Sequence, residues 1–404
     1  MLDGSLKSVL NNKKITEALK ENSIEKLSGK RRIYAVSDHC DIRKKYSSKL
    51  EDIGQVRDLD GKIINGYYSI ATIFVDENRR DITFADIDVF SNKEYSFVSQ
   101  ENLKKYEKDK LLDDEKAKIR ELVESDSYIN KKKSIENQLT NINGSFKEQS
   151  PKTRICYIHD SACDDSNYFK FINKELKQEF VVRLKKSRNS NQTKIDVKGK
   201  EKKIKLIDAK FESKGELTID KIKIKNRLFQ QLKVIVEWNS LKIDEDEYNA
   251  VRVTLKDRNG DKIYKEPIML LTNIGISNFT QAMEIYRIYM LRSKIESVFK
   301  FLKDVLGLEE FRVREFETIK NIISLCFFIG GYFYEIEDIL TKDKTIQLIC
   351  KLGNGKGKVT RYFFLKGLEK LLIAKDVENF IDEFNISDET YQKMLDYAGV
   401  SNDL

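Results

Sequence analysis

The sequence is poor in the residues that build disulfide frameworks, zinc sites and rigid turns. Its 404 residues include five cysteines, two histidines, two prolines and one tryptophan. An odd number of cysteines without a C-x-x-C pair argues against a disulfide framework and for a reducing compartment. Because only two histidines accompany the cysteines, zinc is a weak candidate. The scarcity of proline, beside plentiful Lys, Ile and Asn, indicates an AT-rich coding bias rather than a function.

Long apolar segments are also lacking. The apolar run IISLCFFIGGYF (residues 322–333) is shorter than the roughly 20 residues that a membrane-spanning helix needs. The N-terminus shows none of the features of a signal peptide. These absences predict a soluble, cytoplasmic protein without a membrane partner.

The composition is that of a globular, moderately basic protein. Hydrophobic residues make up 40% of the chain and the formal net charge is +8. Such a charge fits a phosphate-rich partner, although many proteins reach it without binding nucleic acid. Composition therefore permits nucleic-acid binding without establishing it.

The order of the predicted strands and helices indicates the fold class. Three β-rich stretches come first, followed by a charged helical segment, a strand, a helix and another strand. A segment of short alternating polar and apolar steps then predicts an inserted antiparallel β module. A return strand and several helices complete the chain. This order predicts an α/β fold: a ribonuclease H-like mixed sheet with an inserted β module and C-terminal helices.

Five segments follow from this order. The first is too short and polar to form a domain of its own. We expect a short polar N-terminal segment at residues 1–30 and the first part of the catalytic core at 31–190. A β-rich insertion follows at 191–272, then a return strand with the catalytic helix at 273–310, and a C-terminal helical region at 311–404.

Two aspartates close two short apolar runs. Asp38 follows IYAVS, and Asp160 follows ICYIH. Because sites in α/β sheets gather at the carboxyl ends of strands, these side chains converge if the two strands are neighbours. Glu296, on a later predicted helix, can supply a third oxygen ligand. Three carboxylates with open water positions suit one or two Mg²⁺ ions, which can activate a water or a 3′ hydroxyl for phosphodiester chemistry.

The helix that carries Glu296 has a second unusual feature. In YMLRSKIESVFKFLK (residues 289–303), the side chains of Tyr289, Arg292, Glu296 and Lys303 fall within a stripe roughly 60° wide. The stripe borders the apolar face of one continuous helix predicted over residues 278–306. Groups at the edge of a core are partly shielded from water. Arg292 and Lys303 could there contact phosphate oxygens, and Tyr289 offers a hydroxyl group.

Each of these residues also has an ordinary structural interpretation. Aspartates at strand ends are common in turns. Glu296 can be a solvated helix residue that forms a surface salt bridge with Arg292 at i,i+4. Spacing alone does not decide between a catalytic site and a set of surface pairs.

The spacing from Tyr289 to Lys303 matches the Y-x-x-R-x-x-x-E-x-x-x-x-x-x-K signature of bacterial insertion-sequence DDE transposases. Further blocks resemble that family in the same order. They are SDHCDIRKKY, which contains Asp38, IHDSACDDSNYFKFINKELKQEFVVRLKKSR, which contains Asp160, and the strand PIMLLTN that follows the insertion. The resemblance extends over residues 31–345.

The resemblance implies a ribonuclease H-like catalytic core and cut-and-paste DNA transposition through a hairpin, in a bacterial protein associated with the nucleoid. It implies that Asp38, Asp160 and Glu296 are the catalytic metal ligands, for Mg²⁺ with Mn²⁺ as a substitute. The nearby Asp41 and Asp164 lie past the positions that the family pattern selects.

The resemblance also implies which residues and partners bind at the site. Tyr289, Arg292 and Lys303 would bind phosphates at the cleaved transposon end. A basic stretch that would follow the DNA contains Arg183, Lys185 and Arg188. The expected partners are double-stranded DNA, as terminal inverted repeats and as target, and a second copy of the chain in a homodimer that pairs two ends.

The chain departs from the family pattern in several places. Asp38 comes early, so little remains of the N-terminal DNA-recognition region that many relatives carry. Ile268 stands where some relatives place a tryptophan that stacks on a flipped base; Trp238, in the insertion, could serve there or pack in a core. His39 and His159 adjoin the two aspartates, and strand alternation points them to the opposite face, which favours a packing role over proton transfer.

Two other functions remain open at this point. A catalytically inactive or co-opted transposase remnant would bind DNA without cutting it. A ribonuclease H-like nuclease would cut generic substrates without a preference for transposon ends.

Overall fold

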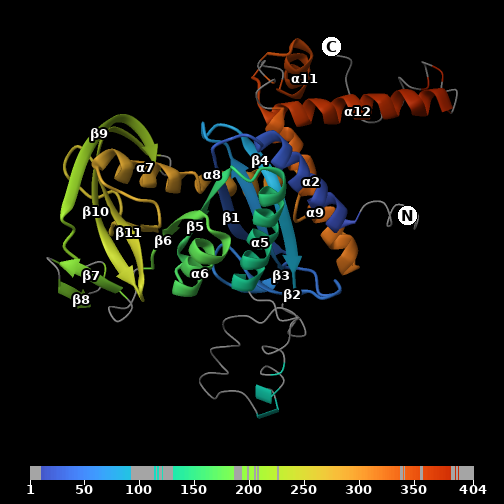
Figure 1. Ribbon diagram of the computed structural model, residues 1–404. Coiled ribbons are helices and arrows are strands. Elements are labelled where there is room, and N and C mark those ends of the chain that lie inside the picture. Colours follow the sequence, from blue (N-terminus) through green and yellow to red (C-terminus); the bar gives the residue numbers. More distant parts are fainter. Residues whose placement is uncertain are drawn as a thin grey trace. The chain divides into compact units, whose positions relative to one another are not determined.

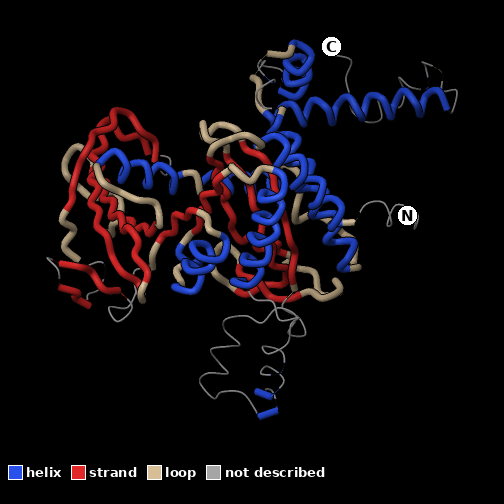
Figure 2. Tube along the Cα trace, viewed as in Figure 1, coloured by secondary structure: helices blue, strands red, loops and turns tan. Residues whose placement is uncertain are grey.

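The computed structural model describes two compact units, Met1–Gly331 and Tyr332–Leu404. It describes residues 11–91, 113–114, 116–117, 121, 131–185, 193–197, 200–203, 206, 209–224, 227–336, 340, 342–354, 358–383, 387 and 390. Figure 1 labels the helices and strands, and Figure 2 colours them by type.

In the described part of the first unit, twelve strands join in one sheet. Its main path runs β2-β3-β1-β5-β6-β12-β11-β10-β7-β8, with β4 paired to β3 and β9 paired to β10. The strands are β1 (Arg32–Arg43), β2 (Gly54–Arg57), β3 (Ile63–Val75), β4 (Ile82–Phe90), β5 (Arg154–His159), β6 (Glu179–Arg183), β7 (Thr193–Val197), β8 (Lys200–Lys203), β9 (Ser213–Ile224), β10 (Arg227–Ile243), β11 (Asp246–Lys256) and β12 (Ile268–Thr272).

The described part of the same unit also contains helices and short helical turns. They are α2 (Asn12–Leu27), α5 (Lys131–Gln149), the short turns η2 (Ser161–Cys163) and η3 (Phe171–Leu176), α6 (Ser166–Lys170), α7 (Phe279–Met290), α8 (Ser293–Asp304) and α9 (Phe316–Glu335), which continues past Gly331.

The first half of the sheet has mixed strand directions. The strands β4, β3 and β1 form an antiparallel meander, and β5 and β6 run parallel to β1. The strand order β4-β3-β1-β5-β6, with helices in the later connections, is that of a ribonuclease H-like sheet. The predicted fold class, with its β insertion and C-terminal helices, is confirmed.

Alternate residues of β1 face two different helical layers. Ile33 and Ala35 belong to a hydrophobic core that also contains residues of α2, α5 and α6. On the same face, Ser37 shares a hydrogen bond of 2.6 Å with Thr72, which donates to Gln138 of α5. Since successive side chains of a strand point to opposite faces, Asp38 lies on the other face, where α8 packs against β1.

The inserted module extends the sheet beyond β6. The long strands β9, β10 and β11 pair antiparallel, and β12 returns between β11 and β6. Helix α7 packs against β10 and β11. Trp238 of β10 is 9% exposed, and its ring lies 6.4 Å from that of Phe279 at the start of α7. Of the two roles considered for Trp238, the structure shows packing in a core.

The second unit contains a closely packed helix pair. Helices α11 (Lys344–Asn354) and α12 (Arg361–Glu383) approach at Gly353 and Gly367. A Cβ atom at either glycine would collide with the backbone of the facing helix, so only glycine permits this crossing. Among the described helices of the chain, none is both long enough and apolar enough to cross a membrane.

An acidic pair under α2 predicts a pH-dependent stability. Burial, and then the neighbouring Asp88, raise the pKa of Asp86 in β4 from 3.8 to about 8, while Lys20 of α2 opposes the shift. Because the folded state then binds a proton that the unfolded state has released, stability falls as the pH rises from about 4 to 8. We expect Asp86→Asn to flatten this dependence and to stabilise the fold at pH 9 by on the order of 1 kcal/mol or more.

Urea unfolding at pH 5 and pH 9 measures this effect. Asp60→Asn, in the exposed β2–β3 turn, is the control and should leave the dependence as in the wild type. Parallel pH profiles for Asp86→Asn and the wild type would contradict the assignment.

Candidate active site

The two aspartates occupy equivalent positions on neighbouring strands. The parallel register of β1 and β5 joins Val36 to Ile158, so two residues later Asp38 lies beside Asp160. Asp160 directly follows β5, as predicted. Asp38 does not end its strand: β1 continues to Arg43, because the run Cys40–Arg43 keeps its pairing with β3. The aspartates therefore meet within the sheet at the point where β5 ends.

The predicted continuous helix over residues 278–306 is wrong in one place. Helix α7 ends at Met290 and α8 begins at Ser293. Between them, the amides of Leu291 and Arg292 donate to the carbonyls three residues earlier, Ile288 and Tyr289, which tightens the turn. The helix breaks there because α7 packs on the insertion and β6, whereas α8 packs on β1.

This junction places one guanidinium among three carboxylates. Arg292 Nη2 donates to Asp38 Oδ2 at 2.8 Å and lies 3.9 Å from Asp160 Oδ2. Arg292 Nη1 donates to Glu296 Oε1 in the first turn of α8. The structure thus brings together the three predicted carboxylates, from β1, the end of β5 and α8, around Arg292.

The electrostatics reflect crowded negative charge. Burial raises the pKa of Asp38 to about 6; Arg292 opposes this shift, and Asp160 and Glu296 add to it. Burial would lower the pKa of Arg292, but Asp38 and Glu296 outweigh it and the pKa is raised. The guanidinium therefore stays charged and partly neutralises the cluster.

Asp160 also has a local structural role. Its Oδ1 accepts a hydrogen bond of 2.8 Å from the amide of Ala162 and so caps the turn η2. The neighbouring Asp164 is 8% exposed, and its Oδ2 accepts from the amide of Lys185 at 2.7 Å. The backbone oxygen of Asp41 accepts a hydrogen bond from Lys303 Nζ. The turn interpretation is thus correct for Asp160, whose carboxylate caps η2 and also lies near Arg292. Asp164 and Asp41 instead contact residues of other elements.

Tyr289 is buried, although the predicted stripe lies at the edge of the core. Its side chain is 7% exposed at the end of α7. Burial raises the pKa of Tyr289, against the opposing effects of Arg183, which is hydrogen-bonded to it, and Arg292. Arg183 and Lys185 are exposed at the end of β6, and Arg188 lies outside the described residues. Tyr289 and Arg183 thus form a pair next to the carboxylates.

Lys303 is turned away from the carboxylates. Its Nζ donates to the backbone oxygen of Asp41 at 2.6 Å and lies 2.9 Å from Glu309 Oε1. Arg43 donates to both carboxylate oxygens of Glu309. These hydrogen bonds and charges outweigh burial and lower the pKa of Glu309. Glu309 was not identified from the sequence, because nothing in its spacing distinguishes it from other exposed acids.

His159 has a packing contact on the far side of the sheet. It is 1% exposed, and its Nε2 shares a hydrogen bond of 2.7 Å with the hydroxyl group of Tyr168 in α6. Burial lowers the pKa of His159 to about 3, so the ring is neutral. Its contact with α6 agrees with the packing role that strand alternation favours.

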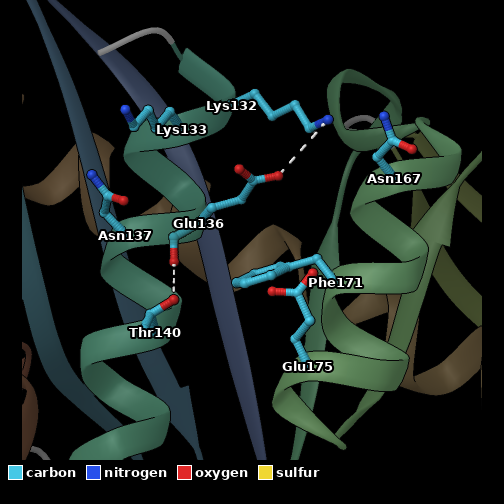
Figure 3. A pocket seen from close by; sticks show the side chains of 8 residues that line it. All are labelled: Lys132, Lys133, Glu136, Asn137, Thr140, Asn167, Phe171 and Glu175. Atoms are coloured by element: carbon cyan, nitrogen blue, oxygen red, sulfur yellow. Dashed lines mark hydrogen bonds and ion pairs between the residues drawn. The ribbon is translucent and has the colours of Figure 1, made fainter. Parts of the chain in front are cut away.

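A cavity of about 510 Å³ lies away from these residues. Figure 3 shows it between α5 and the α6–η3 segment, with Lys132, Glu136 and Phe171 turned toward it. None of the predicted site residues lines this cavity. The candidate site is therefore the acidic cluster around Arg292.

The comparison with protein families adds an independent observation. Residues 136–329 match the family model described as Transposase DDE domain. The match supports a DDE transposase. The matched segment contains Asp160, Arg292 and Glu296 and begins after Asp38. A search of curated proteins found no match.

The family that this model describes generally uses divalent metal ions. The donors are carboxylate oxygens, which hard cations such as Mg²⁺ prefer. In the described part of the chain, however, no three His, Cys, Asp or Glu side chains are grouped closely enough to hold a metal ion. Arg292 lies among the carboxylates instead, and its Nε is buried without a hydrogen-bond partner. The donor chemistry fits a metal, and the guanidinium occupies the space between the donors.

Proposed function

We propose that the chain is an insertion-sequence DDE transposase that cleaves DNA at transposon ends and transfers the freed strand into target DNA. The observation that carries the proposal is the meeting of Asp38, Asp160 and Glu296 from three separate elements. The match to a transposase DDE domain over the segment that holds two of them supports it. The spacing from Tyr289 to Lys303 supports assignment to the subgroup that proceeds through a hairpin.

The same three carboxylates would hold Mg²⁺ or Mn²⁺. When bound, such ions activate a water or a 3′ hydroxyl and stabilise the leaving oxygen of a phosphodiester. Arg292 withdraws from the carboxylates and binds a phosphate, for which its planar fork is suited. Tyr289 and Arg183 orient the adjacent backbone. Lys303 holds α8 against β1 through Asp41 and Glu309, and thereby keeps Glu296 opposite the aspartates.

The proposed function also assigns different parts of the chain to the catalytic core, its insertion and its flanks. Residues 31–190 and 273–310 form the catalytic core, and residues 191–272 form its insertion. The segments 1–30 and 311–404 flank this core. Pairing of two transposon ends requires two active sites, so the working form is a homodimer.

Metal-dependent cleavage of a plasmid that carries the element's own borders tests this function. We expect nicking at the borders with Mg²⁺ or Mn²⁺, none with EDTA, and a loss of at least about 10³-fold in Asp160→Ala, because the metal-bound charge is lost. Asp41→Asn is the matched control, since Asp41 contributes only its backbone oxygen to Lys303. Denaturing gels show whether a hairpin forms.

The alternatives make different predictions in the same assay. A wild-type protein that binds the borders but cuts nothing with either metal is an inactive remnant. Cleavage of plasmids without any preference for the borders indicates a nuclease.

A further inference from the structure

Two largely exposed segments lie side by side just after the C-terminal end of β1 and are joined by hydrogen bonds. Lys44 Nζ donates to the backbone oxygens of Glu309 and Phe311 and lies 3.6 Å from the centroid of the Phe311 ring. Further along, the amide of Glu51 donates to Arg314 O at 2.9 Å, and Glu51 Oε2 accepts from the amide of Phe316 at 2.7 Å. The loop 44–51 and the segment 309–316 are thus joined at both ends and form one platform.

The platform presents cations and an aromatic ring to solvent. In the segment, Phe311 and Val313 are partly buried, whereas Arg312 and Arg314 are exposed. The alternating exposure of residues 311–314 puts these two arginines on one side of the segment, at most about 7 Å apart along the chain. The loop adds exposed lysines at 45 and 49 and the ring of Tyr46, which is 91% exposed.

These cations are available to an outside partner. Among the described residues, no carboxylate is paired with Lys45, Lys49, Arg312 or Arg314. Lys45 Nζ lies 5.4 Å from the centroid of the Tyr46 ring, which leaves its charge exposed. The exposed acids of the segment are Glu310 and Glu315, and Glu315 accepts a hydrogen bond from Thr318.

The platform lies in line with the acidic cluster. The start of helix α8, with Arg292 at its N-cap and Glu296 in its first turn, lies beside Asp38. Near its other end, Lys303 contacts β1 at Asp41. Lys44 directly follows β1 and lies six positions after Asp38, a distance of about 20 Å along an extended chain. A DNA duplex spans the same length in about six base pairs. A duplex with one phosphodiester at the carboxylates could therefore reach the platform.

We propose that Lys45, Tyr46, Lys49, Arg312 and Arg314 form a second DNA-binding surface that holds the phosphate backbone about six base pairs from the cleaved bond. The arginines bind successive phosphates of one strand, and Tyr46 offers a face for stacking on an unpaired base. The proposal rests on the proposed function for its partner, DNA, and adds a surface outside the predicted site.

Fluorescence anisotropy with a labelled duplex of about 30 base pairs and random sequence, in EDTA, tests the surface. We expect Arg312→Ala with Arg314→Ala to weaken binding at least about tenfold and to reduce the slope of log K against log salt by about two. The control is Lys147→Ala with Lys152→Ala, which removes two exposed cations near the start of β5, at the opposite end of that strand from Asp160. A shift in the arginine variant no larger than in this control would overturn the proposal.

A second duplex, copied from one border of the element, distinguishes the sources of the DNA. A larger loss on the border duplex assigns the surface to the transposon end, and an equal loss on both duplexes assigns it to target DNA. Tyr46→Ala should weaken binding of a single-stranded thymine oligonucleotide several-fold, and Tyr46→Phe should restore it.

These measurements separate the surface from the catalytic proposal, because they need no cleavage. Binding that depends on the arginines in a protein that never cuts DNA contradicts only the catalytic function. Cutting by a protein whose arginine variant binds DNA like the control contradicts only the surface. A wild type that binds no DNA contradicts both.

Discussion

Glu296→Gln is expected to lower metal-dependent cleavage at least about 10³-fold while changing the free energy of unfolding by less than about 1 kcal/mol. The side chain of Glu296 is 58% exposed, so the fold gains little from its charge. Under the proposed function, Glu296 supplies the third carboxylate, opposite Asp38 and Asp160. Glutamine keeps the shape and loses the charge that a divalent cation needs.

This substitution separates the two interpretations of Glu296. As a helix partner of Arg292 at i,i+4, it would contribute only about 0.3–0.5 kcal/mol and nothing to the reaction. The matched control is Glu317→Gln, which removes a similarly exposed acid, paired with Lys320 at i,i+3 in α9. Cleavage rates and urea unfolding are measured for both variants. If Glu296→Gln cut DNA at the wild-type rate, Glu296 would be only the partner of Arg292 in a surface salt bridge.

The order of strands and helices along the chain was the readily predictable part of the structure. Apolar runs ending in Asp38 and Asp160 indicated buried strands, and the order of elements indicated a ribonuclease H-like sheet. That the two strands are neighbours was a condition of the prediction, and the parallel pairing of β1 with β5 meets it. What the runs could not show is where β1 ends. Its second half, Cys40–Arg43, alternates like an exposed segment but pairs with β3 over its whole length.

The grouping of Asp38, Asp160 and Glu296 with Arg292 was predictable, and the position of Lys303 was not. Helical spacing puts Tyr289, Arg292, Glu296 and Lys303 on one stripe only if the helix is continuous. The tight turn at Leu291 and Arg292 depends on two different packing surfaces, which local sequence does not encode. Likewise, Lys303 pairs with Glu309 because the chain folds back after α8, a tertiary contact without a sequence signal.

Under the proposed function, Arg292 has two roles that one substitution should separate. In the resting arrangement its guanidinium neutralises Asp38, Asp160 and Glu296, the same oxygens that a divalent cation would take. We expect Arg292→Ala to bind Mn²⁺ at least about tenfold more tightly than the wild type, because no internal cation competes. Cleavage should nevertheless fall, since the phosphate contact is also lost.

Isothermal titration calorimetry with Mn²⁺ on the metal-free protein measures the first effect, and thermal unfolding supports it. Without metal, three unneutralised carboxylates should lower the melting temperature of Arg292→Ala, and Mn²⁺ should raise it by more than in the wild type. Arg32→Ala is the control: it removes an arginine paired with Glu179 at the opposite end of β1 and should leave Mn²⁺ affinity unchanged. If Arg292→Ala bound Mn²⁺ as weakly as the wild type or more weakly, the guanidinium would not compete with the metal for the carboxylates. Its contacts with the carboxylates would then have to persist in the working enzyme.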